Sequence, residues 1–173
     1  MVIFNPVKRE REFNHLTIWR WIPILLLIGF LNSCSSIRNT RMSPLETLIK
    51  EAKSYSGVPY QWGGNNRKGI DCSGLMVNAF QKINIQLPRT TEEQMTVGKK
   101  IRLKKVKPGD LLFFALTEKR RKISHVGLVS DVLPGKKVKF IHASVSAGVT
   151  ESSMDTDYYR KKFRMARRLE IPK

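Results

Sequence analysis

Cysteine, histidine and acidic residues are scarce in this chain of 173 residues. A domain of this size rarely depends on a disulfide framework built from only two cysteines. Cys34 and Cys72 are therefore considered separately, each in its own sequence context. The three histidines and two cysteines include no closely spaced pair of the kind that marks a zinc site. Internal repeats and low-complexity segments are also absent, and the length suits one domain with a genuine core rather than two.

The shortage of acidic residues leaves the chain strongly basic. There are 14 Asp and Glu against 32 Lys and Arg, which gives a net charge of +18 and a pI near 10.3. Beyond residue 33 the chain still has 28 basic and 12 acidic residues, a net charge of +16. This excess indicates an anionic partner, such as nucleic acid, acidic lipid or cell-wall polymer, or a solvated surface that aids solubility. Basic residues are not interleaved with aromatic ones, which argues against nucleic acid.

The longest apolar stretch is too short to span a bilayer. It covers residues 21–31, and eleven helical residues rise only about 16 Å against the roughly 30 Å of a bilayer core. Because a basic segment precedes it and small residues follow, residues 1–33 are predicted to be a secretory signal peptide. An uncleaved anchor and a plain signal cleaved nearby are the alternatives.

The end of that segment, Leu31-Asn32-Ser33-Cys34, resembles the lipobox of bacterial lipoproteins. The resemblance implies that Cys34 is lipidated and becomes the new N-terminus, with acyl chains anchoring the protein in a membrane. Residues 34–42 would then be the lipidated cysteine and a polar tether, followed by a domain at 43–173. Since no aspartate follows Cys34, we expect the periplasmic side of the outer membrane in a Gram-negative host.

Helix-start signals precede strand patterns along the rest of the chain. Ser43-Pro44-Leu45-Glu46 is a capping box with proline at the first helical position, and Gly57 is expected to end that helix. A second capping box at 90–93 opens a short helix through about residue 97. Strands are predicted at 111–115, 123–129, 138–142 and 163–169, with turns at 107–110 and 133–136 and a short helix that begins at 158–159. This order predicts an α+β fold in which N-terminal helices pack on an antiparallel sheet.

Cys72 opens a third helical pattern, which runs to about residue 84. Asp71 is placed to be its N-cap, so Cys72 lies in the first turn. A thiol there feels the positive end of the helix macrodipole and unpaired backbone N–H groups. Such sites lower a cysteine pKa from about 8.5 to roughly 3.5–7.5. The sequence therefore predicts an activated nucleophile.

Two histidines can face this cysteine. His125 stands near the start of one predicted strand and His142 at the end of the next. If these strands pair through the turn at Pro134-Gly135, alternation places both imidazoles on one sheet face. Packing of the Cys72 helix against that face would align thiolate, imidazole and second imidazole, the layout of nucleophile, base and orienting group. Packed structural histidines and a Cys-His-His zinc site are the alternatives.

Six motifs follow one another along the chain: Tyr60-Gln-Trp-Gly-Gly, Gly69-Ile-Asp-Cys-Ser-Gly, Leu87-Pro-Arg-Thr-Thr, Pro108-Gly-Asp-Leu-Leu-Phe-Phe, His125-Val-Gly-Leu and Ile141-His-Ala-Ser. In this order they resemble the NlpC-type family of cell-wall cysteine peptidases, whose fold is papain-like. The resemblance covers about residues 45–169. It implies a Cys72-His125-His142 triad, an active-site role for Tyr60, and recognition of a substrate amine by Asp71 and Ser73.

The resemblance also implies an activity. Family members cleave peptidoglycan stem peptides, typically between γ-D-glutamate and the diamino acid, with no metal or other cofactor. His125 would take the Cys72 proton, His142 would orient His125, and the reaction would pass through a thioester. Tyr60 either contributes to an oxyanion hole or packs, and Asp71 and Ser73 either contact substrate or only begin the helix. The competing functions are a thiol amidase or acyltransferase on the same fold and a non-catalytic, basic wall-binding protein; we expect a monomer.

Overall fold

The structure is a computed structural model that describes residues 42–116 and 122–172. The predicted signal peptide, Cys34 and nearly all of the predicted tether therefore lie outside the described residues. Within the two described ranges, no helix has both the length and the apolar character needed to cross a membrane.

The first helix, α3 (Pro44–Lys53), begins as the capping box predicts. The N–H of Glu46 donates to Ser43 Oγ at 3.2 Å, and the N–H of Ser43 donates to the Glu46 carboxylate at 2.8 Å. Leu48, Ala52 and Tyr55 are buried. Turns follow Lys53, and Gly57 has a φ of +82°, which suits glycine at the end of such a segment.

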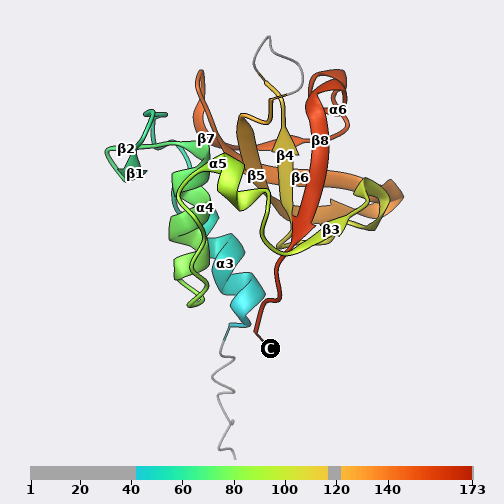
Figure 1. Cartoon of the computed structure of the whole chain (residues 1–173), viewed down its shortest axis with the longest axis horizontal. Coiled ribbons are helices and arrows are strands. Elements are labelled where there is room, and N and C mark those ends of the chain that lie inside the picture. The colour runs from blue at the N-terminus through green and yellow to red at the C-terminus, as the bar shows by residue number, and fades with distance from the viewer. Residues whose placement is uncertain (1–41, 117–121, 173) are drawn as a thin grey trace, which may run out of the picture. The chain divides into compact units, whose positions relative to one another are not determined.

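The sheet is antiparallel throughout, as predicted, and is larger than the sequence patterns indicate. Its strand order is β3-β8-β4-β5-β6-β7 among the described residues (Figure 1). A separate small hairpin precedes the Cys72 helix. The large sheet consists of β3 (Lys99–Ile101), β4 (Leu111–Phe114), β5 (His125–Leu133), β6 (Lys137–Ser144), β7 (Gly148–Ser153) and β8 (Phe163–Arg168), and the hairpin of β1 (Asn65–Asn66) and β2 (Gly69–Ile70).

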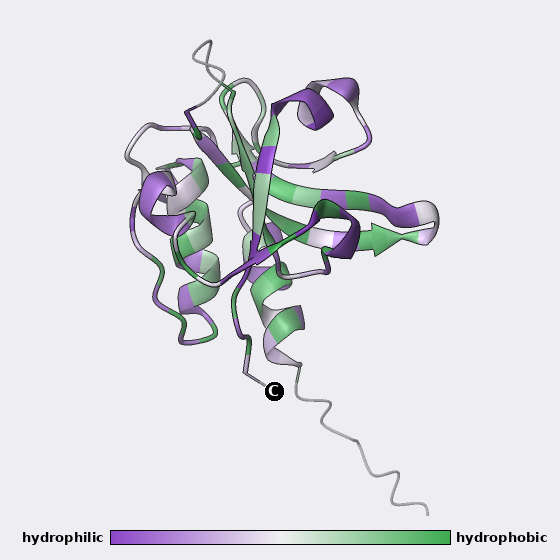
Figure 2. Ribbon diagram, turned by 45° about the vertical axis from the view of Figure 1, so that its right-hand side comes forward, coloured by the Kyte–Doolittle hydropathy of each residue, from purple (hydrophilic) through white to green (hydrophobic). Residues whose placement is uncertain are grey.

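Both faces of this sheet are covered. The helices α3 and α4 (Cys72–Gln81) pack on one face, where Phe113, Val126 and Ile141 join their apolar side chains. The other face holds a second apolar cluster with Phe114 and Phe140, which α6 (Asp157–Lys162) and the 3₁₀ helix η1 (Leu103–Lys105) help to cover. Figure 2 shows green apolar ribbon along the strands that these elements enclose. All four residues of β4 are buried, which explains its unbroken apolar sequence.

Several predicted boundaries need correction. The Cys72 helix ends at Gln81 rather than near residue 84, where Asn84 has a φ of +61°. The helix after the second capping box, α5 (Thr91–Gln94), is one turn long and ends before residue 97. The edge strands β3 and β7 were not predicted, because Lys-Lys-Ile is too short to show a period and Gly148–Ser153 is largely polar. The turn at 133–136, the short helix α6 and the last strand are confirmed.

Candidate active site

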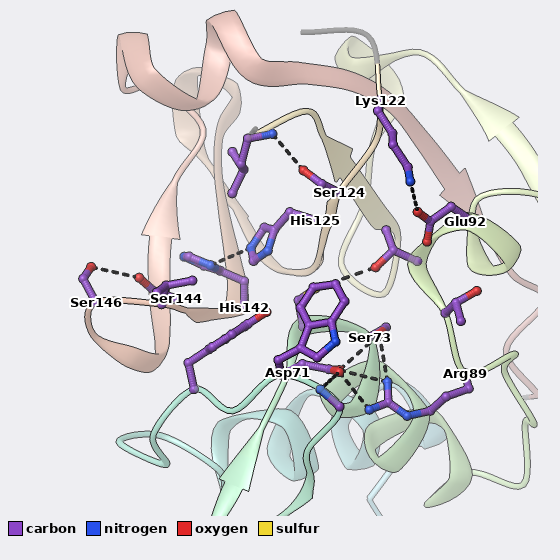
Figure 3. Close-up of a pocket in the computed structure, with 18 of the residues that line it drawn as sticks. Asp71, Ser73, Arg89, Glu92, Lys122, Ser124, His125, His142, Ser144 and Ser146 are labelled. Atoms are coloured by element: carbon purple, nitrogen blue, oxygen red, sulfur yellow. Dashed lines mark hydrogen bonds and ion pairs between the residues drawn. The ribbon is translucent and has the colours of Figure 1, made fainter. Parts of the chain in front are cut away.

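One cavity of about 1000 Å³ collects most of the residues that the sequence singled out. Cys72, His125 and His142 all line it, together with Tyr60, Asp71 and Ser73. It lies where α4 begins, β5 begins and β6 ends (Figure 3). The structure therefore brings together side chains that are far apart in the sequence.

Cys72 occupies the first position of α4, as predicted. The Asp71 carboxylate caps the helix by accepting the N–H of Gly74 at 2.6 Å. The thiol is buried, and Sγ lies 3.7 Å from the hydroxyl oxygen of Thr91 on α5. A Cβ on Gly74 would collide with the carbonyl oxygen of Gly64, so the glycines on either side of the cysteine let the preceding loop pack directly on the first helical turn.

The predicted low pKa of the Cys72 thiol is wrong for the free protein. Burial raises the pKa of this thiol, and the negative charge of Asp71 raises it further. Hydrogen bonds from the N–H of Val126, the Thr91 hydroxyl and the N–H of Ser73 only partly oppose that effect. The helix-start position was correct, but a buried sulfur loses more by desolvation than it gains from these donors. The Val126 contact also places the sulfur against the residue that follows His125.

The two histidines share a sheet face and contact each other. His125 Nε2 lies 2.9 Å from His142 Nδ1, and the rings meet nearly edge to face. Both are on the face that carries Phe114 and Phe140, since the His142 ring stacks on Phe140. The prediction that the Cys72 helix packs on this same face is wrong, because α4 packs on the opposite one. Cys72 and the histidines meet instead at the end of the strands.

Two hydroxyl groups lie within hydrogen-bond distance of the His142 ring nitrogen that faces away from His125. This nitrogen, Nε2, lies 3.0 Å from Ser152 Oγ on β7 and 3.1 Å from the Tyr159 hydroxyl on α6. Tyr159 also packs its ring against Phe114 and Phe140. Sequence inspection missed both residues, because Ser152 lies on an unpredicted strand and nothing in the sequence pairs Tyr159 with a residue 17 positions earlier.

Both imidazoles are neutral near pH 7. Burial lowers the pKa of His125 to about 3, and the charge that His142 can carry adds to that shift. Burial alone lowers the pKa of His142 to about 4. The free site therefore contains a neutral thiol beside two neutral rings rather than a preformed ion pair.

Arg89 is the second element of the site that sequence inspection missed. Its Nη1 and Nη2 donate to the two Asp71 carboxylate oxygens at 2.9 and 2.8 Å, and it also donates to Ser73 Oγ at 3.0 Å (Figure 3). Burial raises the Asp71 pKa, but hydrogen bonds from Arg89, Gly74 and Ser73 and the Arg89 charge leave it below its ordinary value. The Leu87-Pro-Arg-Thr-Thr motif contained this arginine, yet spacing alone could not show which carboxylate it binds.

Tyr60 and Ser73 are placed beside the nucleophile candidate. Tyr60 lines the cavity and forms a β-bridge to Ile70, and its pKa is raised by burial and by the nearness of Cys72 and Asp71. Ser73 is buried and donates to Asp71 Oδ1 at 3.1 Å. No group of three or more His, Cys, Asp or Glu side chains suited to a metal ion occurs in the described part of the chain.

Comparison with known proteins identifies the fold around this cavity. The family model of the NlpC/P60 family matches residues 57–168, which is more than half of the chain and includes every cavity residue discussed above. The chain belongs to the NlpC/P60 family. The family resemblance and the α+β fold predicted from the sequence motifs are therefore confirmed.

Relatives within this family cover much of the chain. The probable endopeptidase NlpC of Escherichia coli strain K12 is 37% identical over 153 residues, which cover 86% of this chain and 96% of that protein. The gamma-DL-glutamyl hydrolase of Bacillus subtilis strain 168 is 41% identical over 131 residues, or 73% of this chain and 30% of that protein. The crystal structure of an NlpC/P60 family protein from Bacillus cereus matches with a TM-score of 0.65 and 28% identity, covering 74% of this chain and 40% of that one.

Proposed function

We propose that this NlpC/P60 protein is a thiol endopeptidase that cleaves peptidoglycan stem peptides. The observation that carries the proposal is the meeting of Cys72 with the hydrogen-bonded pair His125 and His142 in one cavity. A nucleophile, a base and a group that orients the base are the minimum set for acyl transfer by a thiol. The names of the two relatives described above, an endopeptidase and a glutamyl hydrolase, support hydrolysis of a peptide or glutamyl bond.

The hydrogen bonds define how protons would be arranged before reaction. If His142 carries its proton on Nε2, that N–H donates to the hydroxyl oxygens of Ser152 and Tyr159. His142 Nδ1 is then an acceptor and takes the N–H of His125 Nε2. This leaves His125 Nδ1 unprotonated and able to accept the Cys72 proton. In this tautomer both hydroxyl groups act as acceptors and His125 is a base, and we assign to the hydroxyl groups the role of favouring it.

The reaction follows from this arrangement. As the Cys72 proton moves to His125, the sulfur attacks the scissile carbonyl, and the His125 imidazolium then protonates the leaving amine. Water hydrolyses the thioester, with His125 again as base, and returns the thiol. Because the free thiol and imidazole are both neutral, the proton moves as the sulfur attacks or once substrate is bound. The Cys72 N–H and the Tyr60 hydroxyl are the candidate donors to the developing oxyanion.

The proposed substrate bond is the one between γ-D-glutamate and the diamino acid of a stem peptide. A role for Asp71 and Ser73 in binding a substrate amine is less well supported than their role in capping. Asp71 already accepts hydrogen bonds from Gly63, Ser73, Gly74 and Arg89, and the arginine balances its charge. We therefore assign Asp71 and Ser73 to holding the start of α4, and Ser73, which also lines the cavity, to contact with substrate as well.

We place the protein in the cell envelope, exported by residues 1–33 and anchored through lipidated Cys34. The lipobox resemblance supports this proposal, and the intact mass of protein purified from membranes tests it. Acyl groups on an N-terminal Cys34 are the expected result. A chain that retains residues 1–33 would contradict it.

Incubation of purified muropeptides with Cys72→Ala tests the proposed activity. We expect the wild-type protein to release fragments whose masses correspond to cleavage after γ-D-glutamate, and the variant to release none. Lys82→Ala, at an exposed position after α4, is the matched control and should behave as wild type. Circular dichroism checks that both variants fold. Wild-type turnover by a folded Cys72→Ala protein would refute the nucleophile, and release of intact stem peptides separated from the sugar would instead favour an amidase.

A further inference from the structure

The segment Lys99–Lys107 is one of the two most basic stretches of the described domain, the other being residues 160–168. It reads Lys-Lys-Ile-Arg-Leu-Lys-Lys-Val-Lys and contains no acidic residue. All six of its basic residues are exposed, whereas Ile101, Leu103 and Val106 belong to or pack on the second apolar cluster. The apolar side chains therefore fix the segment on the sheet and leave the cations outward. We call these six residues, Lys99, Lys100, Arg102, Lys104, Lys105 and Lys107, the basic edge.

Few of these charges are neutralised within the protein. Lys99 forms an exposed ion pair with Glu170 at 2.8 Å. None of the other five members of the basic edge forms an ion pair within the described residues. By contrast, the charged residues that line the cavity are paired, Arg89 with Asp71 and Lys122 with Glu92. Positive charge is thus available on the basic edge and balanced at the cavity.

The basic edge lies at the end of the domain where the described chain begins. The turn that follows Lys107 packs on the start of α3, because a Cβ on Gly109 would collide with Leu45 and Ile171. From this turn β4 runs towards the cavity, and its last residue, Phe114, pairs with His125. Figure 1 shows the same arrangement, with the start of α3, the C-terminal end and β3 at the lower end of the domain. The start of the domain and the cavity are therefore at opposite ends of β4.

The proposed lipid anchor limits how far this end can be from a membrane. Eight residues, 35–42, separate Cys34 from Ser43, and eight residues span at most about 29 Å when fully extended. Cationic side chains near an anionic leaflet each strengthen binding by about fivefold, an effect that falls off over a Debye length of about 8–10 Å. A tether of this length can bring the basic edge within that range.

We propose that the basic edge docks on the anionic lipid headgroups of the membrane that holds the protein, so that the cavity points away from the membrane towards the wall. The proposal rests on lipidation of Cys34, which belongs to the proposed function. Lipid is favoured over a wall polymer as the partner of the basic edge because this segment lies beside the tether end and at the opposite end of β4 from the cavity. A wall substrate held by the basic edge would be a strand length away from Cys72.

Lysine footprinting of the full-length acylated chain tests this docking. The protein is reconstituted into phosphatidylcholine vesicles with or without about 30 mol % phosphatidylglycerol. It is then acetylated briefly, and the acetylation of each lysine is measured by mass spectrometry. We expect acetylation of Lys100, Lys104 and Lys105 to fall about fivefold or more in anionic vesicles and to recover in about 1 M salt. Lys68 on the hairpin before α4 and Lys122 at the cavity are the internal controls and should label equally in both.

Equal labelling of the basic edge in both kinds of vesicle would overturn the docking. So would protection by purified wall polymer in solution that matches or exceeds protection by anionic vesicles. A membrane-purified chain without acyl groups on Cys34 would overturn the anchoring on which the proposal rests. Hydrolysis of soluble muropeptides by the same preparation reports separately on the proposed activity, because that assay needs neither the anchor nor the basic edge. Lys100→Gln/Lys104→Gln/Lys105→Gln should keep that hydrolysis and lose the protection of the remaining basic-edge lysines, Lys99 and Lys107, in anionic vesicles.

Discussion

Charged side chains are paired in the cavity and mostly unpaired and solvated on the basic edge. In the cavity, Asp71 is enclosed by four hydrogen-bonding residues and matched by Arg89, and the two histidines stay neutral. On the basic edge, exposed lysines and an arginine extend from an edge strand and the segment after it, with a single ion pair, Lys99 to Glu170, among the described residues. The net charge of the chain is therefore a property of its surface and says little about its chemistry.

This difference predicts how each region responds to substitution. Cavity residues are interlocked, so the loss of one hydrogen bond leaves a buried group without its partner and costs free energy. Basic-edge residues are solvated, so their loss changes association with anionic partners and leaves folding almost unaffected.

Removal of the base should have the largest effect. His125→Asn is expected to lower kcat on muropeptides by about 10²–10⁴-fold, because the Cys72 proton loses its acceptor. Steady-state kinetics measure the loss, and Lys104→Gln on the basic edge is the matched control. A folded His125→Asn protein that retained more than a tenth of wild-type kcat would show that another group accepts the proton.

Acid should destabilise the protein through the buried histidines. Each has an ordinary pKa of 6.5 when unfolded, but a pKa of about 3 (His125) or about 4 (His142) when folded. Between these values the unfolded chain binds more protons, so the free energy of unfolding falls as pH drops below about 6.5, by up to ~1.4 kcal/mol per pH unit for each histidine.

Urea unfolding at pH 7, 6 and 5 measures this slope. His142→Asn removes one titrating ring and should roughly halve the slope over that range. Carboxylates such as Asp71, whose pKa lies below its ordinary value, also lose stabilising charge in acid, but only nearer pH 4 and below. Equal slopes in the wild-type and variant proteins would show that His142 is not buried in the neutral form.

Loss of Arg89, which pairs with the Asp71 cap of α4, should lower the stability of the fold more than it lowers kcat. Arg89→Met leaves the largely buried Asp71 carboxylate without its cation, and we expect unfolding to become easier by about 2–3 kcal/mol after allowance for the partial exposure of Arg89. The midpoint of urea unfolding reports this change. Lys105→Met on the basic edge should change stability by less than ~0.5 kcal/mol. Equal losses of unfolding free energy in Arg89→Met and Lys105→Met would contradict the difference proposed between the cavity and the basic edge.

The smallest effect should come from the hydroxyl groups behind His142. Tyr159→Phe keeps the ring packed on Phe140 and removes one hydrogen-bond partner, so we expect kcat to fall about three- to tenfold with KM unchanged. Tyr159→Phe with Ser152→Ala should cost more than the product of the single losses, because each hydroxyl can replace the other at Nε2. An unchanged kcat in the double variant would exclude the proposed control of the tautomer.

Local signals in the sequence predicted the elements that hold the site. The capping box at Ser43, the N-cap at Asp71 and the strands around His125 and His142 depend on neighbouring residues, and the structure confirms them. Even the meeting of the two histidines follows from one hairpin turn and strand alternation.

Features that depend on tertiary packing were not predictable in the same way. The face on which α4 packs is set by the apolar side chains of the whole sheet. The thiol pKa is set by burial that no sequence window contains. Arg89, Ser152 and Tyr159 are joined to their partners only by the fold, since each partner is at least 10 residues away in the sequence. The sequence thus indicated the reactive groups, while the structure was needed to find the residues that position them.

The most direct test of the account is to trap the acyl-enzyme. A muropeptide is mixed with the wild-type protein, the reaction is quenched in acid within milliseconds, and the peptide that contains Cys72 is weighed by mass spectrometry. We predict a mass increase equal to the acyl portion of the substrate, carried on Cys72, removed by mild hydroxylamine as a thioester is, and absent from the Cys72→Ala protein. Rapid product formation with Cys72 unmodified at every quench time, and with undiminished turnover in Cys72→Ala, would contradict the claim that this sulfur is the nucleophile.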